Sequence, residues 1–175
     1  MTIKVAVLGS KGRMGAEVVK AVSNASDLEL VASIDQNDDF NIVKNSGAQV
    51  AVDFTTPDSV MANLEFLISN GINAVVGTTG FDAGRISKLE KMIAASPKVG
   101  VLIAPNFAIG AVLMMEFATK AAKYFESAEI IELHHPDKVD APSGTASRTA
   151  ELMSKARKDA GLTAMPDATS TSLDG

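Results

Sequence analysis

Short apolar runs alternate with longer stretches of mixed polarity along most of the chain. Five runs rich in Val, Ile and Leu show little alternation between apolar and polar positions, which is typical of strands covered on both faces of a parallel sheet. These runs are residues 4–8, 28–34, 50–54, 74–76 and 99–103. The pattern therefore predicts five parallel strands, and a sixth apolar run at residues 129–134 predicts one further strand.

The stretches between these runs carry apolar residues at helical spacing. They predict helices over residues 13–23, 57–69, 82–96, 110–126 and 144–160. Thr56 and Pro57 supply a cap and a proline at the first helical position of the second of these helices. Strands alternating with helices predict a doubly wound α/β domain of the Rossmann type over residues 1–126. Residues 127–175 are predicted to start an α+β substrate-binding domain, in which 135–142 form a polar loop.

The composition indicates a globular protein of 175 residues, with 46% hydrophobic and 21% charged residues. The absence of cysteine excludes disulfides and Cys-ligated zinc, and it fits a reducing compartment. A formal net charge of -5 argues against general nucleic-acid binding, which needs a basic surface. The chain opens on a strand without a signal peptide, and no apolar run has the length of a membrane span. We therefore expect a cytoplasmic protein with no membrane or nucleic-acid partner.

Three glycines follow the first predicted strand at the spacing Gly-x-x-Gly-x-x-Gly. Gly9 permits a tight turn, Gly12 lets the backbone approach a pyrophosphate, and Gly15 lets the helix pack closely on the strand. Asp35 ends the second strand, where a ribose hydroxyl of a bound dinucleotide needs an acceptor. These residues predict a dinucleotide site, although the commoner spacing is Gly-x-Gly-x-x-Gly and the glycines could serve only a tight turn.

The predicted cofactor is NADH or NADPH. Asp35 favours NADH because a carboxylate repels a 2′-phosphate, and Gln36 adds no compensating charge. Lys11 and Arg13 suit a 2′-phosphate or the pyrophosphate, and the alternative is that they are solvated surface charges. We therefore predict that both cofactors are used. The loop residues predicted to contact the cofactor are Gly9, Ser10, Lys11, Gly12, Arg13 and Met14.

Two loops that follow later strands are predicted to line the nicotinamide half of the same site. Ligands of open α/β sheets bind at the carboxyl ends of the strands, although Gly, Thr, Asn and Pro are also common in ordinary turns. Phe54 ends the third strand and is included among the candidate cofactor residues, although we favour a core position for it over a wall of the adenosine or nicotinamide pocket. The loop residues assigned to the cofactor are Gly77, Thr78, Thr79, Ala104, Pro105, Asn106 and Phe107.

Both histidines of the chain, His134 and His135, stand side by side, and Lys138 follows within the same loop. An imidazole exchanges protons near neutral pH, and a lysine supplies a proton or a fixed positive charge. Three readings remain: acid-base catalysis, a structural histidine facing away from any site, and a metal site shared with Asp137 or Asp140. The metal reading is disfavoured because neighbouring side chains of a strand diverge.

A helix start follows this loop. A serine after a proline is typical of a helix cap, and the free amides and partial positive charge of such a helix end bind an anionic oxygen. The residues of this helix start that suit an anion are Ser143, Gly144 and Thr145.

These segments, taken in order, resemble the 4-hydroxy-tetrahydrodipicolinate reductase (dihydrodipicolinate reductase) family, in particular its actinobacterial branch. The resemblance rests on Gly9-x-x-Gly12-x-Met14-Gly15, Asp53-Phe54-Thr55, Gly77-Thr78-Thr79-Gly80, Pro105-Asn106-Phe107 and Glu132-x-His134-His135-x-x-Lys138-x-Asp140-Ala141-Pro142-Ser143-Gly144-Thr145-Ala146. The double-histidine segment is the most specific of these. The resemblance implies NAD(P)H-dependent reduction of a small cyclic dicarboxylate on the diaminopimelate and lysine route.

The resemblance also implies individual roles. His134 would donate or accept a proton and Lys138 would donate one, while His135 and the helix start at Gly144 and Thr145 would hold the substrate. Members of the family continue beyond Gly175 to complete the substrate-domain sheet, which also makes a homotetramer. We therefore expect this chain to lack that part and the full-length form to be tetrameric.

Two other functions remain possible from the residues. One is a different dehydrogenase on the same nucleotide domain, such as an amino-acid dehydrogenase, which the compact His-His-x-x-Lys loop disfavours. The other is a non-catalytic module that only binds a dinucleotide. Activity toward the cyclic dicarboxylate would distinguish the reductase from both of these alternatives.

Overall fold

A parallel five-stranded sheet forms the N-terminal part of the computed structural model, which describes residues 1–104, 106–134 and 142–163. The strand order is β2-β1-β3-β4-β5, as the doubly wound prediction requires. The strands are β1 (Ile3–Leu8), β2 (Leu28–Ile34), β3 (Val50–Asp53), β4 (Asn73–Val76) and β5 (Val101–Ile103). The five predicted strands are thus confirmed, with ends that differ by at most two residues.

Strand register brings the carboxyl ends of the strands to one edge of the sheet. Leu8 at the end of β1 pairs with Ile34 of β2 on one side and with Asp53 of β3 on the other. Asp53 in turn pairs with Val76 at the end of β4. The loops that follow these strands therefore begin side by side, at the edge where ligands of such sheets bind.

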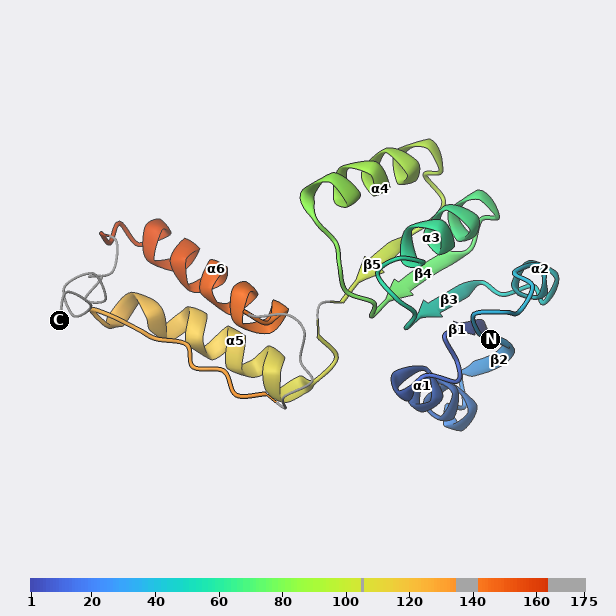
Figure 1. The fold of residues 1–175 in the computed structure, drawn as a ribbon, viewed down its shortest axis with the longest axis horizontal. Helices are drawn as coiled ribbons and strands as arrows, with labels where there is room; N and C mark the ends of the chain where they lie inside the picture. The colour runs from blue at the N-terminus through green and yellow to red at the C-terminus, as the bar shows by residue number, and fades with distance from the viewer. Residues whose placement is uncertain (105, 135–141, 164–175) are drawn as a thin grey trace. The chain divides into compact units, whose positions relative to one another are not determined.

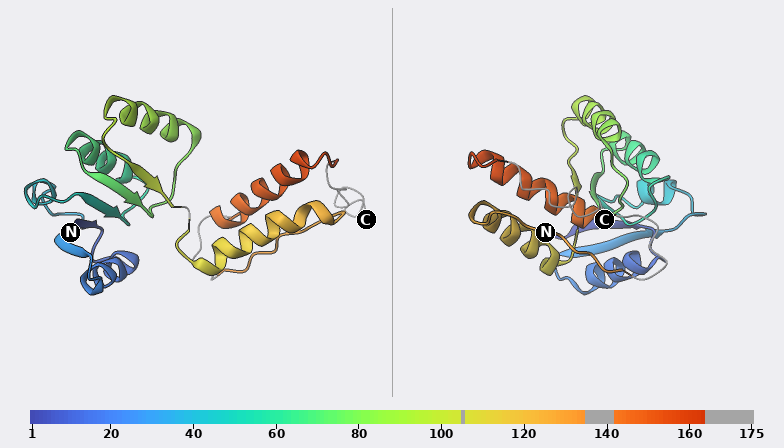
Figure 2. Two further views of the ribbon diagram at one scale, coloured as in Figure 1. Left: turned by 180° about the vertical axis from the view of Figure 1, so that it is seen from behind. Right: turned by 60° about the vertical axis from the view of Figure 1, so that its left-hand side comes forward.

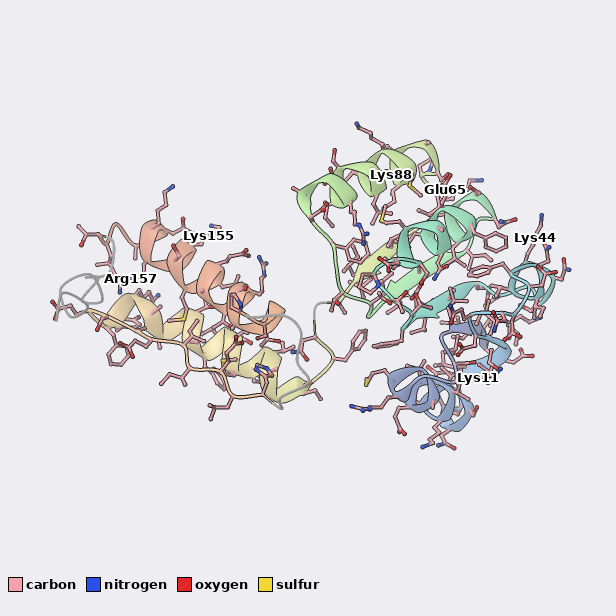
Figure 3. The ribbon with its side chains drawn as sticks, in the orientation of Figure 1. Lys11, Lys44, Glu65, Lys88, Lys155 and Arg157 are labelled. Carbon is pink, nitrogen blue, oxygen red and sulfur yellow. The ribbon has the colours of Figure 1, made fainter. Side chains whose placement is uncertain are left out.

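Helices cover both faces of this sheet. α1 (Arg13–Asn24) lies on one side of it, and α3 (Val60–Ser69) and α4 (Ala83–Ala95) lie on the other (Figures 1 and 2). An exposed ion pair of 3.5 Å joins Lys88 of α4 to Glu65 of α3 (Figure 3). The core between the layers is aliphatic and includes Leu8, Ile34, Val43, Val60, Leu64, Leu67 and Val76, all nearly inaccessible to solvent. Strands buried on both faces explain the unbroken apolar runs in the sequence.

Two helices differ from the predictions. α2 (Asn41–Asn45) was not predicted, because one turn of helix is too short to show a period. α3 begins at Val60 rather than at Pro57, since the amides of Ser59 and Val60 both donate to the Thr56 carbonyl and form a turn first. The prediction that Pro57 occupies the first helical position is therefore wrong.

The chain divides into two compact units, Met1–Pro105 and Asn106–Gly175, which we call the first and second units. The predicted boundary after residue 126 differs from this division. The helix predicted at 110–126 is α5 (Ile109–Ala121), which is followed by the 3-10 turn η1 (Ala122–Tyr124). α5 packs against α6 (Gly144–Asp159) and belongs to the second unit (Figures 1 and 2).

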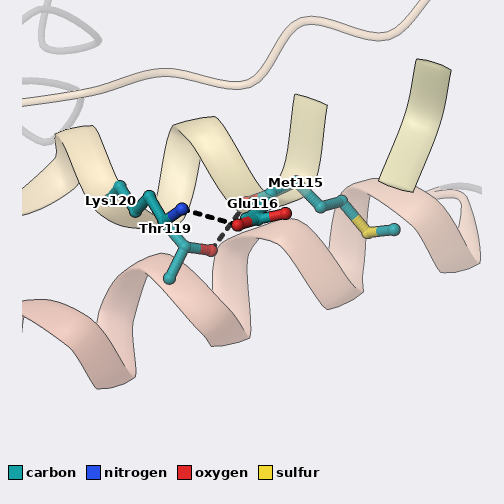
Figure 4. A network of polar contacts seen from close by, with 4 residues as sticks. All are labelled: Met115, Glu116, Thr119 and Lys120. Carbon is teal, nitrogen blue, oxygen red and sulfur yellow. Dashed lines mark hydrogen bonds and ion pairs between the residues drawn. The ribbon is translucent and has the colours of Figure 1, made fainter. Parts of the chain in front are cut away.

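In the described part of the second unit, the buried side chains lie on α5, η1 and α6 and at Ser143, which precedes α6. Met115 of α5 and Met153 of α6 are buried, while the Lys120–Glu116 ion pair of α5, 2.6 Å long, is exposed (Figure 4). Arg157 near the end of α6 is also buried (Figure 3). Its guanidinium donates to the carbonyls of Ala122, at 2.8 Å, and of Phe125, at 2.5 Å. It thereby joins α6 to carbonyls beyond the end of α5.

The strand predicted at residues 129–134 is absent. These residues are described and have no regular secondary structure; they run back alongside α5 (Figures 1 and 2). A strand requires a neighbour for its backbone hydrogen bonds, and the described part of the second unit contains no strand to pair with. Ile131 and Leu133 of this run are 82% and 91% exposed.

Candidate active site

The glycine loop between β1 and α1 has the geometry that its spacing predicts. Gly9 has a φ of 75°, a conformation that favours glycine, and its amide donates to the Ile34 carbonyl at 2.9 Å. A Cβ on Gly15 would lie 1.9 Å from the Gly9 carbonyl oxygen, so α1 begins in direct contact with the loop. The N-terminal end of α1 is thus held against the carboxyl end of β1, where its unpaired amides suit an anion.

Asp35 lies beside this loop, as predicted. One carboxylate oxygen accepts from the Lys11 amide and the other from the Gln36 amide, both at 2.8 Å. These amides, that of Gln36 first, together with the nearby Lys11 charge, hold the pKa of the Asp35 carboxyl below its ordinary value against a small opposing effect of burial. Lys11 lies in the loop beside α1 (Figure 3). Asp35 is therefore a charged acceptor at the edge of the loop.

A cleft of about 390 Å³ opens next to the loop, a volume within the usual range of small-molecule sites. Of the residues predicted to contact a cofactor, Gly9, Gly12, Asp35 and Phe54 line it together. Phe54 is half-buried and forms part of the cleft wall, so the favoured core position is wrong. The other lining residues, which the sequence analysis left without a cofactor role, are Leu8, Ile34, Gln36, Phe40, Thr55, Thr56, Ser59 and Asn63.

The loop after β4 lies against the loop after β3. A Cβ on Gly77 would be 2.2 Å from the Phe54 ring, so the small residue predicted here lets the ring approach. Thr78 is buried, and its hydroxyl donates to the Asp53 carboxylate at 2.8 Å. Asp53 is a further residue for which no role was predicted. Its signal in the sequence is a carboxylate at the end of an otherwise apolar strand. Ala104, after β5, donates its amide to the Val76 carbonyl.

The start of α6 in the second unit is capped as predicted. The Ser143 hydroxyl accepts from the Ala146 amide at 3.1 Å. The Ser143 amide itself lies 3.0 Å from both carboxylate oxygens of Glu132, a residue without a predicted role. The remaining first-turn amides, those of Gly144 and Thr145, have no helical acceptor and face outward from the helix end. The amides of Gly144 and Thr145 are thus available to bind an anion.

Asn106, predicted on the cofactor side, belongs to the second unit. Its amide group donates to the Thr145 hydroxyl at 3.1 Å, and its carbonyl oxygen accepts from the Ala108 amide. Asn106 therefore connects the chain entering the unit with the predicted substrate-binding helix start. Phe107, assigned to the cofactor, is 47% exposed.

The double-histidine loop is described only at its first residue. His134 is exposed and lies two residues after Glu132. The predicted site residues Pro105, His135 and Lys138 lie outside the described residues, as do Asp137 and Asp140. Within the described ranges, no three His, Asp or Glu side chains are grouped as metal ligands, and no helix combines the length and apolarity of a membrane span.

The parallel sheet, the glycine loop at the start of α1 and the cleft beside Asp35 define a nucleotide-binding oxidoreductase domain of the Rossmann type. The first unit matches the family model "Dihydrodipicolinate reductase, N-terminus" over residues 3–107, and the second matches "Dihydrodipicolinate reductase, C-terminus" over residues 110–171. The chain belongs to the dihydrodipicolinate reductase family, a family of nicotinamide-dependent oxidoreductases. The resemblance seen in the sequence is confirmed.

Relatives and solved structures agree with this assignment. The chain is 61% identical over its whole length to the 4-hydroxy-tetrahydrodipicolinate reductase of Corynebacterium efficiens and 60% identical to that of Nocardia farcinica. It spans 71% of each relative. A dipicolinate-bound dihydrodipicolinate reductase from Paenisporosarcina sp. TG-14 has 38% identity and a TM-score of 0.76, over 90% of this chain and 67% of that one. GenD2 of gentamicin A biosynthesis, solved with NAD, shares the fold at 17% identity and a TM-score of 0.59.

Proposed function

We propose that this chain carries out the NAD(P)H-dependent reduction of 4-hydroxy-tetrahydrodipicolinate to tetrahydrodipicolinate, a step of diaminopimelate and lysine biosynthesis. The observation that carries the proposal is the match of both units to dihydrodipicolinate reductase models. Identities of 61% and 60% to relatives named for this reaction support it. The dipicolinate held by the Paenisporosarcina enzyme supports a small cyclic dicarboxylate as the substrate class.

The residues of the first unit fit a nicotinamide dinucleotide. A Cβ on Gly12 would lie 3.2 Å from the Gly9 carbonyl oxygen, so a side chain there would crowd the loop where the pyrophosphate would approach. Asp35 keeps further lone pairs for ribose hydroxyls, because each oxygen accepts only one amide in the contacts above. The other proposed contacts are those predicted above: the loop 9–14, Phe54, the segment 77–79 and the segment 104–107.

The residues of the second unit are proposed to hold the substrate and move a proton. The amides of Gly144 and Thr145 would bind one substrate carboxylate, supported by the cap at Ser143 and the favourable charge of a helix N-terminus. His135 would contact the substrate. When bound, the reduced nicotinamide supplies a hydride. His134 and Lys138 would then supply the proton and stabilise the negative charge that builds on the substrate.

Oxidation of NADH by the purified protein with freshly made 4-hydroxy-tetrahydrodipicolinate tests this function. We expect turnover that falls at least about a hundredfold in kcat in His134→Gln and in Lys138→Ala, the scale of general acid-base catalysis. Lys120→Ala is the matched control, because this lysine is an exposed partner of Glu116 on α5. NADH binding without turnover would favour the non-catalytic module. Turnover that is equal in all four proteins would contradict the assigned roles.

Use of both cofactors is proposed for the same site. Asp35 favours NADH, while Lys11 and Arg13 are cations in the loop that can meet a 2′-phosphate. We expect values of kcat/KM for NADH and NADPH that lie within about a hundredfold, or about 2.7 kcal/mol, of each other. A larger preference for either cofactor would contradict dual use.

We further propose a cytoplasmic enzyme that is a homotetramer in its full-length form. The family resemblance and the exposed apolar side chains of the second unit support assembly. Sedimentation of the full-length protein is expected to give a tetramer. A stable monomer would contradict the proposed assembly.

A further inference from the structure

The Asp53 carboxylate is fully buried at the carboxyl end of β3 and joins three segments of the chain. One oxygen accepts from the Thr55 amide at 2.9 Å and the Thr55 hydroxyl at 2.7 Å, and also from the Thr78 hydroxyl at 2.8 Å. The other accepts from the Asn63 amide group of α3 at 2.8 Å. A buried carboxylate is costly unless its oxygens are satisfied, and here four donors satisfy them.

The loops that Asp53 joins also pack tightly elsewhere. A Cβ on Gly77 would overlap the Phe54 ring, and one on Gly80 would lie 2.7 Å from the Pro57 side chain. On the outer side, the Arg85 guanidinium donates to the carbonyls of Pro57 at 2.7 Å and Gly80 at 3.0 Å. The loop after β3, residues 54–59, and the loop after β4, residues 77–80, therefore form one body, with Asp53 at its buried base.

We propose that Asp53 is a positioning residue for the nicotinamide half of the bound cofactor. This inference rests on the proposed function, because it assumes a nicotinamide dinucleotide in the cleft. Thr55 and Phe54 line that cleft, and Thr78 follows β4 at the same sheet edge. Asp53 sets the distance between the two loops without contacting the cofactor, since Thr55, Thr78 and Asn63 surround its carboxylate.

The adenosine half of the site has hydrogen bonds of its own, while the Phe54 carbonyl packs against Gly9. Asp35 bonds to the amides of Lys11 and Gln36, and the glycine loop bonds to the Ile34 carbonyl. None of these hydrogen bonds includes Asp53. A change confined to Asp53 is therefore expected to weaken binding of the nicotinamide portion and to leave binding of the ADP portion unchanged. General loosening of the unit would weaken binding of both portions.

Equilibrium binding of NADH and of ADP-ribose to Asp53→Asn tests the inference, because ADP-ribose lacks only the nicotinamide. Asparagine keeps the size of the side chain but places an NH₂ group among donors. We expect the Kd for NADH to rise about tenfold and the Kd for ADP-ribose to change less than about twofold. Equal loss of both ligands, or no loss of either, would overturn the inference.

Asn73→Asp is the matched control, since Asn73 links loops at the opposite ends of the same strands. Its side chain donates to the Gln49 carbonyl and accepts from the Gly100 amide. We expect this variant to lower the thermal unfolding midpoint and leave the ratio of the two Kd values unchanged. A changed ratio would overturn the inference, because it would show that the ratio reports general destabilisation.

Thr78→Val and Thr78→Ser provide a second test that does not depend on the folding of Asp53→Asn. Valine removes the hydroxyl that donates to Asp53, and serine keeps it. The ratio of the Kd for NADH to the Kd for ADP-ribose is expected to rise in the valine variant. In the serine variant it is expected to return toward the value of the unchanged protein. Loss in both to the same extent would overturn the inference. If the unchanged protein binds neither ligand, the proposed function fails together with it.

Discussion

The two units of the chain bury their apolar residues to very different degrees. In the first unit, the aliphatic side chains of the sheet, α2, α3 and α4 form one continuous core. In the second, the buried apolar side chains within the described residues are Met115, Ala122 and Met153. Its exposed large apolar residues are Phe107, Ile109, Val112, Leu113, Met114, Phe117, Tyr124, Phe125, Ile130, Ile131, Leu133 and Leu162.

This difference teaches how each half of the proposed site is held. In the first unit, the glycine loop and Asp53 lie at the ends of strands that are packed from both sides. The close-packed core therefore limits the motion of the loops that follow these strands. The second unit holds the helix start at Ser143 by single polar contacts of Glu132 and Asn106, and the guanidinium of Arg157 holds the other end of α6 against η1. We therefore expect the first unit to resist local opening and the second to depend strongly on individual hydrogen bonds.

Gly15→Ala is expected to have the largest effect, and it would show that the first unit tolerates little change in packing. Its Cβ would lie 1.9 Å from a backbone oxygen, so α1 must move away from the loop. We expect a loss of about 3 kcal/mol in the free energy of unfolding and loss of NADH binding, measured by urea denaturation and titration.

Gly110→Ala in α5 is the matched change in the second unit, since a Cβ there meets no atom within 4 Å. A gain of about 0.5 kcal/mol is expected from the higher helix propensity of alanine. Similar losses in both variants would contradict the contrast between the two units.

Arg157→Ala tests the dependence of the second unit on one side chain. Removal of the guanidinium leaves the carbonyls of Ala122 and Phe125 without their partner, at a cost of about 2 kcal/mol. Hydrogen exchange should therefore accelerate in α5 and α6 while remaining unchanged in β1, β3 and β4. Arg148→Ala, which removes only an exposed ion pair with Glu151, is the control. Faster exchange throughout both units would show that they do not open independently.

Glu132→Gln is expected to have a smaller and more local effect. The glutamine keeps one acceptor for the Ser143 amide but loses the negative charge at the helix N-terminus, which is worth about 1 kcal/mol. Exchange of the first-turn amides of α6 should rise about fivefold. Glu151→Gln further along the same helix should leave these amides unchanged. Unaltered exchange in Glu132→Gln would show that Ser143 alone holds the helix start.

The smallest effect is expected from the pH dependence that Asp35 contributes. Its pKa is lowered in the folded state, so its stabilisation is present above the unfolded value near 3.8 and is lost as the pH falls through the folded value. Solvent screening limits it to a few tenths of a kcal/mol. Urea denaturation should show a stability difference between the protein and Asp35→Asn that is constant at neutral pH and shrinks below pH 3.8. A difference that grows on acidification would contradict the sign.

The predictions succeeded where local pattern and burial coincide. The strands of the first unit are rich in Val, Ile, Leu and Ala because helices cover both faces of the sheet, and the glycine spacing reflects a turn that excludes side chains at Gly9 and Gly15. They failed where the outcome depends on a partner. The run at 129–134 has strand-like composition, but no described strand of its unit is available for pairing. The apolar period at 110–126 predicts a helix, but it does not show to which unit this helix belongs.

The sequence by itself determined the class of the first unit, the position of the dinucleotide loop, the capped helix start at Ser143 and the family. These depend on periods, glycine spacing and capping residues, which act over a few neighbouring positions. Only the tertiary structure decided that Phe54 lines the cleft, that α5 belongs to the second unit and that Asp53 and Glu132 connect separate segments. The Asp53–Thr78 and Glu132–Ser143 hydrogen bonds join residues 25 and 11 positions apart, and the tertiary structure brings these residues together.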